Sequence, residues 1–312
     1  MKVAIFGGCG FIGSSLTDHL TDSGHQVVVV DHRESIKEGT PHIDFNSLSG
    51  EQLIKLFRTV EVIYYLHWLG TPQTNERQPH ECISSNLGKL SLTLEALSWT
   101  VNPPRLIYVS SGGAIYGDVK GLVSEREQPK PIGVYGFAKL QAEQMVIFFS
   151  QKFGLNSLIL RPSNPYGRSQ RTDNNHGIIP TILRKAISGD EISIWGDGSI
   201  IRDYLFIDDV TIALAHCIDF GLDASVNRCE TFNIGSGVGH SLNALLDVVK
   251  AVTSLDLHVV YKENRGFDVK HIVLDANRFS ERFAWKAQIA LDQGIERIWE
   301  DLKTRADEGR TN

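Results

Sequence analysis

The stretch KVAIFGGCGFIG, residues 2–13, decides the fold of this chain of 312 residues. Residues 2–6 form an apolar run that predicts a strand, and residues 11–23 have the apolar spacing of a helix. Where the two meet, Gly7, Gly10 and Gly13 are spaced GxxGxxG. Such a turn lets the backbone approach a phosphate closely and lets the helix pack tightly on the sheet. The segment therefore predicts a strand, a tight turn and a helix whose N-terminus binds phosphate.

The second strand supports a dinucleotide site. Gln26–Val30 (QVVVV) ends at Asp31, which follows the last glycine of the turn by 18 residues (31 − 13 = 18). An acid at this place accepts hydrogen bonds from the adenosine ribose and repels a 2′-phosphate, so NAD is favoured over NADP, although Arg33 could soften that preference. We expect cofactor contacts from Gly7, Gly10, Phe11, Ile12, Gly13 and Asp31 and, near the adenine, from Asp44 and Phe45.

The first half of the chain alternates short apolar runs with longer helical patterns. Further strands are expected at 62–66, 105–110 and 156–160, and helices at 51–57, 86–99 and 135–150. Apolar strands separated by helices are typical of a parallel sheet covered on both faces. After Arg161 the rhythm loosens into a polar loop, with a helix expected at 178–188 and a strand at 192–195. We expect a nucleotide-binding domain over 1–163, completed by about 203–220, and a smaller substrate domain from 164–202 and 221–312.

Composition excludes several other classes of protein. The formal net charge of −6 argues against a nucleic-acid binder. The four cysteines contain no CxxC pair, so we expect neither a disulfide framework nor a metal site. The apolar run at the N-terminus is too short for a signal peptide, and no run approaches the roughly 18 residues of a membrane span. We therefore expect a cytoplasmic protein without nucleic-acid or membrane partners.

The segment GVYGFAK, residues 133–139, carries the expected chemistry. Tyr135 and Lys139 stand four residues apart, so on a helix the phenol and the ammonium share one face. A free tyrosine has a pKa of about 10 and is a poor base at neutral pH. A nearby ammonium and a positively charged nicotinamide ring both favour the phenolate. We therefore expect Tyr135 to take a proton from a sugar hydroxyl, and Lys139 to hold the nicotinamide ribose as well.

Several ordered motifs extend over nearly the whole chain. They are GGCGFIG at 7–13, SSGGAIYG at 110–117, YGFAK at 135–139, RPSNPYG at 161–167, WGDGSIIRDYLFIDDV at 195–210, NIGSG at 233–237 and RGFDVKHIVLD at 265–275. Together they resemble the extended short-chain dehydrogenase/reductases, and more narrowly the NAD-dependent epimerase/dehydratase group typified by UDP-glucose 4-epimerase. The resemblance implies an α/β fold, a Rossmann-type doubly wound parallel sheet with a smaller C-terminal α/β substrate domain. It also implies a homodimer built on the helices at 86–99 and 135–150.

The resemblance assigns roles to further residues. Asn164 would contact the nucleotide-sugar substrate, Arg202 and Arg265 would neutralise its diphosphate, and Asp268 would hold its nucleotide ribose. Asn86 would lie near the cofactor, at the start of its helix.

One position departs from the family pattern. Where the family has a Ser or Thr that hydrogen-bonds the reacting sugar oxygen, this chain has Gly112, so we expect Ser111 or a water to supply the hydroxyl. The next two positions, an Asp-Glu pair in sugar dehydratases, hold Gly113 and Ala114, which have no acid or base group. The loss counts against a dehydratase or decarboxylase.

The most consistent function is C4 epimerisation of a UDP-hexose through a transient 4-keto intermediate, with Tyr135, Lys139 and Ser111 as catalytic residues. A nucleotide-sugar dehydratase or oxidoreductase is the enzymatic alternative, and a non-catalytic NAD-binding protein is the alternative from another class. A role in polysaccharide biosynthesis follows by analogy with the family.

Overall fold

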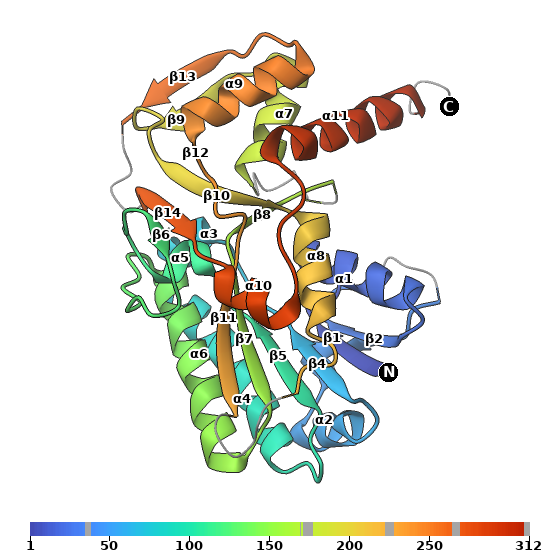
Figure 1. The fold of residues 1–312 in the computed structure, drawn as a ribbon. Coiled ribbons are helices and arrows are strands. Elements are labelled where there is room, and N and C mark those ends of the chain that lie inside the picture. The colour runs from blue at the N-terminus through green and yellow to red at the C-terminus, as the bar shows by residue number, and fades with distance from the viewer. Residues whose placement is uncertain (35–38, 169, 171–176, 222–227, 264–268, 309–312) are drawn as a thin grey trace.

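The computed structural model describes residues 1–34, 39–168, 170, 177–221, 228–263 and 269–308, with the backbone alone for 305–308. Its centre is a seven-stranded parallel sheet in the order β11-β7-β5-β4-β1-β2-β3 (Figure 1). The strands are β1 (Lys2–Phe6), β2 (Gln26–Asp31), β3 (His42–Asp44), β4 (Val62–Tyr65), β5 (Arg105–Val109), β7 (Ser157–Pro162) and β11 (Cys229–Ile234). Strands β2 and β3 are added on one side of β1, and β4, β5 and β7 on the other, so the order of strands reverses between β1 and β4. Ligands bind at the carboxyl ends of strands beside such a point.

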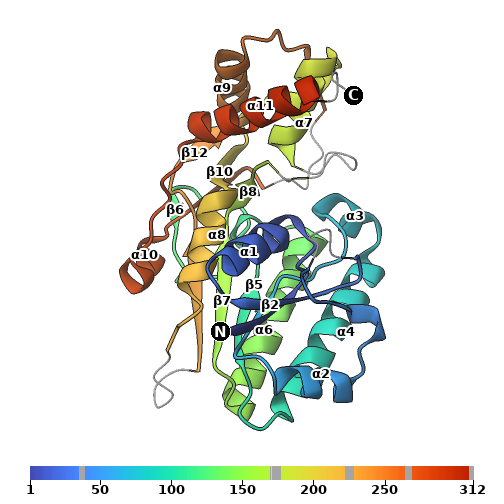
Figure 2. The same ribbon diagram turned by 90° about the vertical axis from the view of Figure 1, so that its right-hand side faces the viewer.

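Helices cover both faces of this sheet (Figures 1 and 2). One face carries α1 (Phe11–Asp22) and α8 (Ile207–His216), which contact each other; the other carries α2 (Gly50–Phe57), α4 (Pro79–Ser98) and α6 (Val134–Phe153). Residues of β1 alternate between the two resulting cores, with Val3 and Ile5 in one and Ala4 and Phe6 in the other. All four are fully buried, which explains why this strand is apolar throughout.

The smaller domain stands beyond the carboxyl ends of the large sheet (Figures 1 and 2). It contains the strand path β12-β10-β14-β6, with β8 paired to β10, and the separate pair β9 and β13. These strands are β6 (Leu122–Val123), β8 (Asn164–Tyr166), β9 (Ile192–Trp195), β10 (Ile201–Phe206), β12 (Gly239–Ser241), β13 (Val259–Lys262) and β14 (His271–Leu274). The remaining elements are η1 (Phe45–Ser47), α3 (Pro72–Arg77), α5 (Gly112–Ile115), α7 (Ile178–Ser188), α9 (Leu242–Thr253), α10 (Asn277–Phe283) and α11 (Leu291–Glu308).

The structure confirms the expected α/β fold with a parallel sheet and differs from the expectations in several places. Strand β6, within the stretch 1–163 that was assigned to the nucleotide-binding domain, pairs with β14 of the smaller domain. Helix α4 begins at Pro79 rather than Asn86; proline tolerates the first helical position because its missing N–H has no partner there. Strand β11 joins the edge of the large sheet beside β7, although 221–312 was assigned to the smaller domain. Strands far apart in the sequence pair here, which local periodicity does not reveal. No helix within the described residues is long and apolar enough to span a membrane.

Candidate active site

The turn after β1 forms a cradle that only glycine fits. Gly7 has φ 83°, and a Cβ on Gly13 would collide with the carbonyl oxygen of Gly7. Gly10 is the N-cap of α1, and because it has no side chain, the first N–H groups of the helix, which begins with Phe11 and Ile12, have no side-chain cap. A phosphate fits such a bare helix N-terminus. The cradle therefore fits the pyrophosphate of a dinucleotide.

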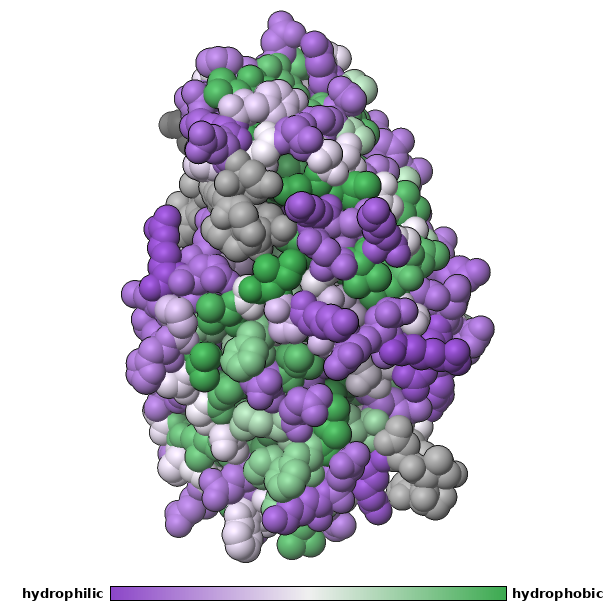
Figure 3. Space-filling model, turned by 90° about the vertical axis from the view of Figure 1, so that its left-hand side faces the viewer, coloured by the Kyte–Doolittle hydropathy of each residue, from purple (hydrophilic) through white to green (hydrophobic). Residues whose placement is uncertain are grey.

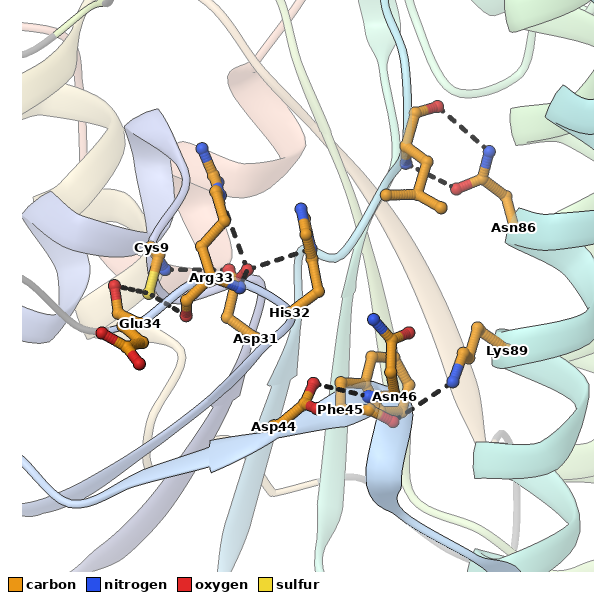
Figure 4. A network of polar contacts seen from close by, with 11 residues as sticks. Cys9, Asp31, His32, Arg33, Glu34, Asp44, Phe45, Asn46, Asn86 and Lys89 are labelled. Atoms are coloured by element: carbon orange, nitrogen blue, oxygen red, sulfur yellow. Dashed lines mark hydrogen bonds and ion pairs between the residues drawn. The ribbon is translucent and has the colours of Figure 1, made fainter.

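Asp31 lies beside this turn, as expected. Its buried carboxylate accepts hydrogen bonds from the backbone N–H of Cys9 at 3.0 Å and of Arg33 at 3.0 Å (Figure 4). The Arg33 Nε lies 3.6 Å from the same carboxylate, and His32 Nδ1 lies 3.1 Å from it. The carboxylate is thus fixed at the carboxyl end of β2, one strand away from the turn.

The expected adenine contacts, Asp44 and Phe45, have structural roles as well. Asp44 caps the short helix η1 by accepting from the N–H of Asn46 at 2.9 Å. The Phe45 ring is fully buried and packs edge-on against Phe6, with 5.1 Å between ring centroids. The Phe45 ring belongs to the core and its carbonyl accepts a hydrogen bond from Lys89 Nζ at 3.2 Å, so the adenine contact of this residue stays a prediction.

Asn86 does not stand at the start of its helix as expected, and its contact with the cofactor stays a prediction. It lies in the interior of α4, and its side chain bonds the backbone of Leu69: the Leu69 N–H donates to Oδ1 at 2.7 Å, and Nδ2 donates to the Leu69 carbonyl at 3.2 Å (Figure 4). Nδ2 also donates to the carbonyl of Cys82 at 2.8 Å. Asn86 therefore anchors the segment that follows β4, with its polar atoms engaged by protein.

Tyr135 and Lys139 lie one turn apart near the start of α6, as the sequence predicts. The Lys139 ammonium is buried and donates to the Val109 carbonyl at 3.0 Å. Burial lowers the pKa of Lys139 to about 7, against the opposing effect of the Glu143 carboxylate. Burial also raises the pKa of Tyr135 to about 12, and the hydrogen bond with the Ser111 hydroxyl lowers it in part.

The geometry of α5 determines how Ser111 and Gly112 are oriented relative to Tyr135. A Cβ on Gly112 would collide with Leu274 and with the Arg161 carbonyl, so this position faces the protein interior. Ser111 is the N-cap of α5 but makes no capping hydrogen bond, and its hydroxyl instead reaches the Tyr135 phenol. The structure therefore brings Ser111 to the phenol and leaves no space for a serine at 112.

Two side chains of the site were missed by sequence reasoning. The Trp68 ring packs edge-on against Tyr135, with 5.8 Å between centroids, and the Lys139 Nζ lies over the Trp68 ring at 4.1 Å from its centroid. His67 is buried beside the glycine turn, and its Nε2 has no hydrogen-bond partner among the described residues. Burial lowers the pKa of His67 to about 4. Both residues follow the end of β4 within three positions, beside the place where the strand order reverses, and this position could have marked them in the sequence.

Of the four substrate residues that the resemblance assigned, the structure describes two, Asn164 and Arg202. Asn164 on β8 donates to the Asp203 carbonyl at 3.0 Å and lies next to Gly113 of α5. Arg202 lies on β10, the strand paired with β8, and donates to the Ile201 carbonyl at 3.0 Å. The structure thus places Asn164 beside α5, and Arg202 one strand away. Arg265 and Asp268 lie outside the described residues.

A buried polar network of Glu143, Arg161, Tyr116 and Asn233 lies next to the Tyr135–Lys139 pair. Arg161 binds Glu143 through Nε at 3.0 Å and Nη2 at 2.6 Å, and its Nη1 donates to the Tyr116 hydroxyl at 2.7 Å. That hydroxyl donates to Asn233 Oδ1 at 2.7 Å. The network therefore ties α6 to β7 and β11, below the Tyr135–Lys139 pair. Over the part of the chain that the structure describes, no three His, Cys, Asp or Glu side chains gather as metal ligands.

Comparison with known proteins gives one family and several close folds. The family model of the NAD dependent epimerase/dehydratase family matches residues 3–235. The UDP-glucose 4-epimerase of Thermotoga maritima, solved with UDP-glucose, is 30% identical with a TM-score of 0.89, covering 98% of this chain and 100% of its own. The UDP-glucose 4-epimerase of Thermus thermophilus in complex with NAD is 25% identical with a TM-score of 0.87, covering 97% and 99%. The dTDP-4-dehydro-6-deoxyglucose reductase of Escherichia coli is 25% identical over 316 residues, covering 97% and 98%.

Proposed function

Since this chain belongs to the NAD-dependent epimerase/dehydratase family, we propose that it is an NAD-dependent epimerase that inverts C4 of a UDP-hexose. The observation that carries the proposal is the grouping of Tyr135, Lys139 and Ser111, which is linked to the glycine turn after β1 through His67 and Trp68. Two similar solved structures are UDP-glucose 4-epimerases, one with UDP-glucose and one with NAD, which supports this substrate class and cofactor.

The proposed chemistry assigns a task to each residue. Bound NAD supplies the acceptor and donor of hydride at C4. Tyr135 takes the proton of the 4-hydroxyl and later returns it, while Ser111 holds the same oxygen by a hydrogen bond. Lys139 holds the nicotinamide ribose. Because burial leaves the pKa of Tyr135 at about 12 in the protein alone, the phenolate needs the positive charge of the oxidised nicotinamide nearby.

The residues of α5 favour epimerisation over dehydration. Gly113 and Ala114 follow Ser111 and Gly112 and provide no acid or base, whereas epimerisation needs only the transfer of one proton to Tyr135 and back. We assign the substrate's diphosphate to Arg202 and Arg265, its nucleotide ribose to Asp268, and a polar contact to Asn164. The similarity to a reductase keeps a net oxidoreductase as the second candidate.

The Tyr135→Phe variant tests this function. We expect the variant to lose turnover of UDP-glucose and UDP-galactose while binding NAD as the wild type does, since only the phenol oxygen is removed. Tyr261→Phe, at an exposed tyrosine on β13, is the matched control and should keep full activity. Products resolved by NMR and absorbance at 340 nm distinguish the candidates: accumulated NADH would favour the oxidoreductase. Undiminished epimerisation by Tyr135→Phe would refute the assignment.

We also propose a cytoplasmic homodimer that supplies precursors for polysaccharide. The outer surface of α6 exposes Phe137, Phe148 and Phe153. Figure 3 views the molecule from the side of α6 and shows apolar residues gathered on its lower half. Pairing α4 and α6 with a second copy would cover these rings. Light scattering at micromolar concentration should give the mass of two chains, and the mass of one chain would contradict the dimer.

A further inference from the structure

The candidate active site contains an aromatic side chain, Trp68, that lies outside the family motifs. Trp68 follows β4 and contacts both members of the Tyr135–Lys139 pair. We propose that Trp68 is a positioning residue: the face of its ring holds the Lys139 ammonium, and its contact with Tyr135 fixes the orientation of the phenol. The inference rests on the function proposed above, because it concerns the same pair.

Among the described residues, the Lys139 ammonium has few polar partners, so its contact with the face of the Trp68 ring matters for its stability as a cation. The ammonium donates to the Val109 carbonyl, and two aromatic rings lie near its other sides: Trp68 at 4.1 Å and Tyr108 at 5.4 Å from Nζ to the centroid. An aromatic face attracts a desolvated cation and replaces part of the water that burial removes. The titratable groups around this ammonium are Glu143 and Tyr135 on α6, Cys82 on α4, His67 after β4 and Tyr108 on β5.

The backbone around Trp68 is anchored at two points. Asn86 binds the N–H and the carbonyl of Leu69, the next residue along the chain. Further on, Glu76 of α3 accepts a hydrogen bond from the backbone N–H of Val134, at the first residue of α6. The segment from β4 to α3 is therefore fixed both to α4 and to the turn that carries Tyr135. Such anchoring is what a positioning residue requires, because a mobile ring would not hold its neighbours.

Two substitutions at Trp68 distinguish the effect of its aromatic ring from the effect of its indole N–H. The indole N–H is buried and has no hydrogen-bond partner in the described ranges. Trp68→Phe keeps an aromatic face and removes this donor, whereas Trp68→Leu removes both. If the ring face matters, the two variants differ; if the donor matters, they behave alike. Trp99→Phe is the matched control, because Trp99 is 71% exposed at the end of α4.

The experiment measures kcat, KM and NAD affinity of the full chain across pH 5.5–9.5, with NAD binding followed by calorimetry on cofactor-free protein. For Trp68→Leu we expect kcat to fall about ten-fold with little change in KM. We also expect the pH midpoint that reports the ammonium to move down by about 0.5 to 1 unit, as for the loss of one cation–π contact. Trp68→Phe should shift the midpoint by less than half as much, and Trp99→Phe should match the wild type. Should Trp68→Leu fail to fold, Trp68→Met replaces it.

Two results would overturn the inference. One is a pH profile of Trp68→Leu that superimposes on that of the wild type; the other is an equal loss in the Phe and Leu variants, which would assign the effect to the N–H. Failure of the proposed function is a separate result. A wild-type protein without turnover of any UDP-hexose would refute the epimerase, while the pH dependence of NAD binding would still test the Trp68–Lys139 contact.

Discussion

Arg161 holds Glu143 by two hydrogen bonds, at 3.0 and 2.6 Å, one helical turn beyond Lys139 on α6. Both side chains are buried, with 8% and 0% of their surfaces exposed. The carboxylate is thereby fixed where its charge favours the protonated form of Lys139. The Arg161–Glu143 pair thus supports the charge of a residue at the candidate site.

Breaking this pair should destabilise the protein strongly. Glu143→Gln leaves the Arg161 guanidinium buried without its counter-charge, and we expect a loss of about 3–5 kcal/mol in the free energy of unfolding. Denaturation in urea measures it. The control is Glu230→Gln, which removes the partner of Arg278 in a more exposed pair and should cost about 0–1 kcal/mol. Similar losses in the two variants would contradict the supporting role of Glu143.

Ser111 should account for the hydroxyl that Gly112 lacks. Ser111→Ala removes the group that bonds the Tyr135 phenol, and we expect kcat to fall about 100-fold while NAD affinity is kept. Adding Gly112→Ser to Ser111→Ala should not restore activity, because its Cβ would collide with Leu274 and the Arg161 carbonyl. Steady-state kinetics and calorimetry check both expectations. Rescue by the serine at 112 would show that the reacting oxygen lies on the other side of α5.

The buried ammonium should make stability depend on pH. Folding lowers the pKa of Lys139 from 10.5 to about 7, so between these values the unfolded chain binds the additional proton. The free energy of unfolding therefore rises with pH through this window, and below pH 7 the full cost of the buried charge remains. In urea denaturation, Lys139→Met should lack this rise. Parallel pH curves for the variant and the wild type would mean that Lys139 keeps its ordinary pKa.

The glycine cradle should tolerate no side chain at its end. Gly13→Ala places a Cβ against the Gly7 carbonyl, which forces the turn apart, and we expect NAD affinity to fall at least about ten-fold. The matched control is Gly88→Ala on α4, where an added Cβ meets nothing within 4 Å. It should keep NAD affinity and gain about 0.5–1 kcal/mol of stability from helix propensity. Calorimetry with NAD that cannot tell the two variants apart would argue against the cradle.

Local patterns in the sequence determined the sheet, the glycine turn and the Tyr135–Lys139 pair. Each depends on residues close together in the chain: an apolar run followed by glycines, or two side chains one helical turn apart. The boundary at Pro79 was missed because the polar residues that follow it interrupt the apolar spacing. Strand β11 was misplaced because its pairing with β7 joins segments about 70 residues apart, a number set by the register of Cys229 with Ser157.

Only the tertiary structure decided which side chains complete the site. It turned Gly112 inward and Ser111 towards the phenol, it gave Asn86 the backbone of Leu69 as a partner, and it brought Trp68 against Lys139. These contacts join separate strands and helices across the carboxyl end of the sheet. A sequence specifies its own turns and helical faces by short-range sterics, but the packing of one element against another fixes which way a side chain points.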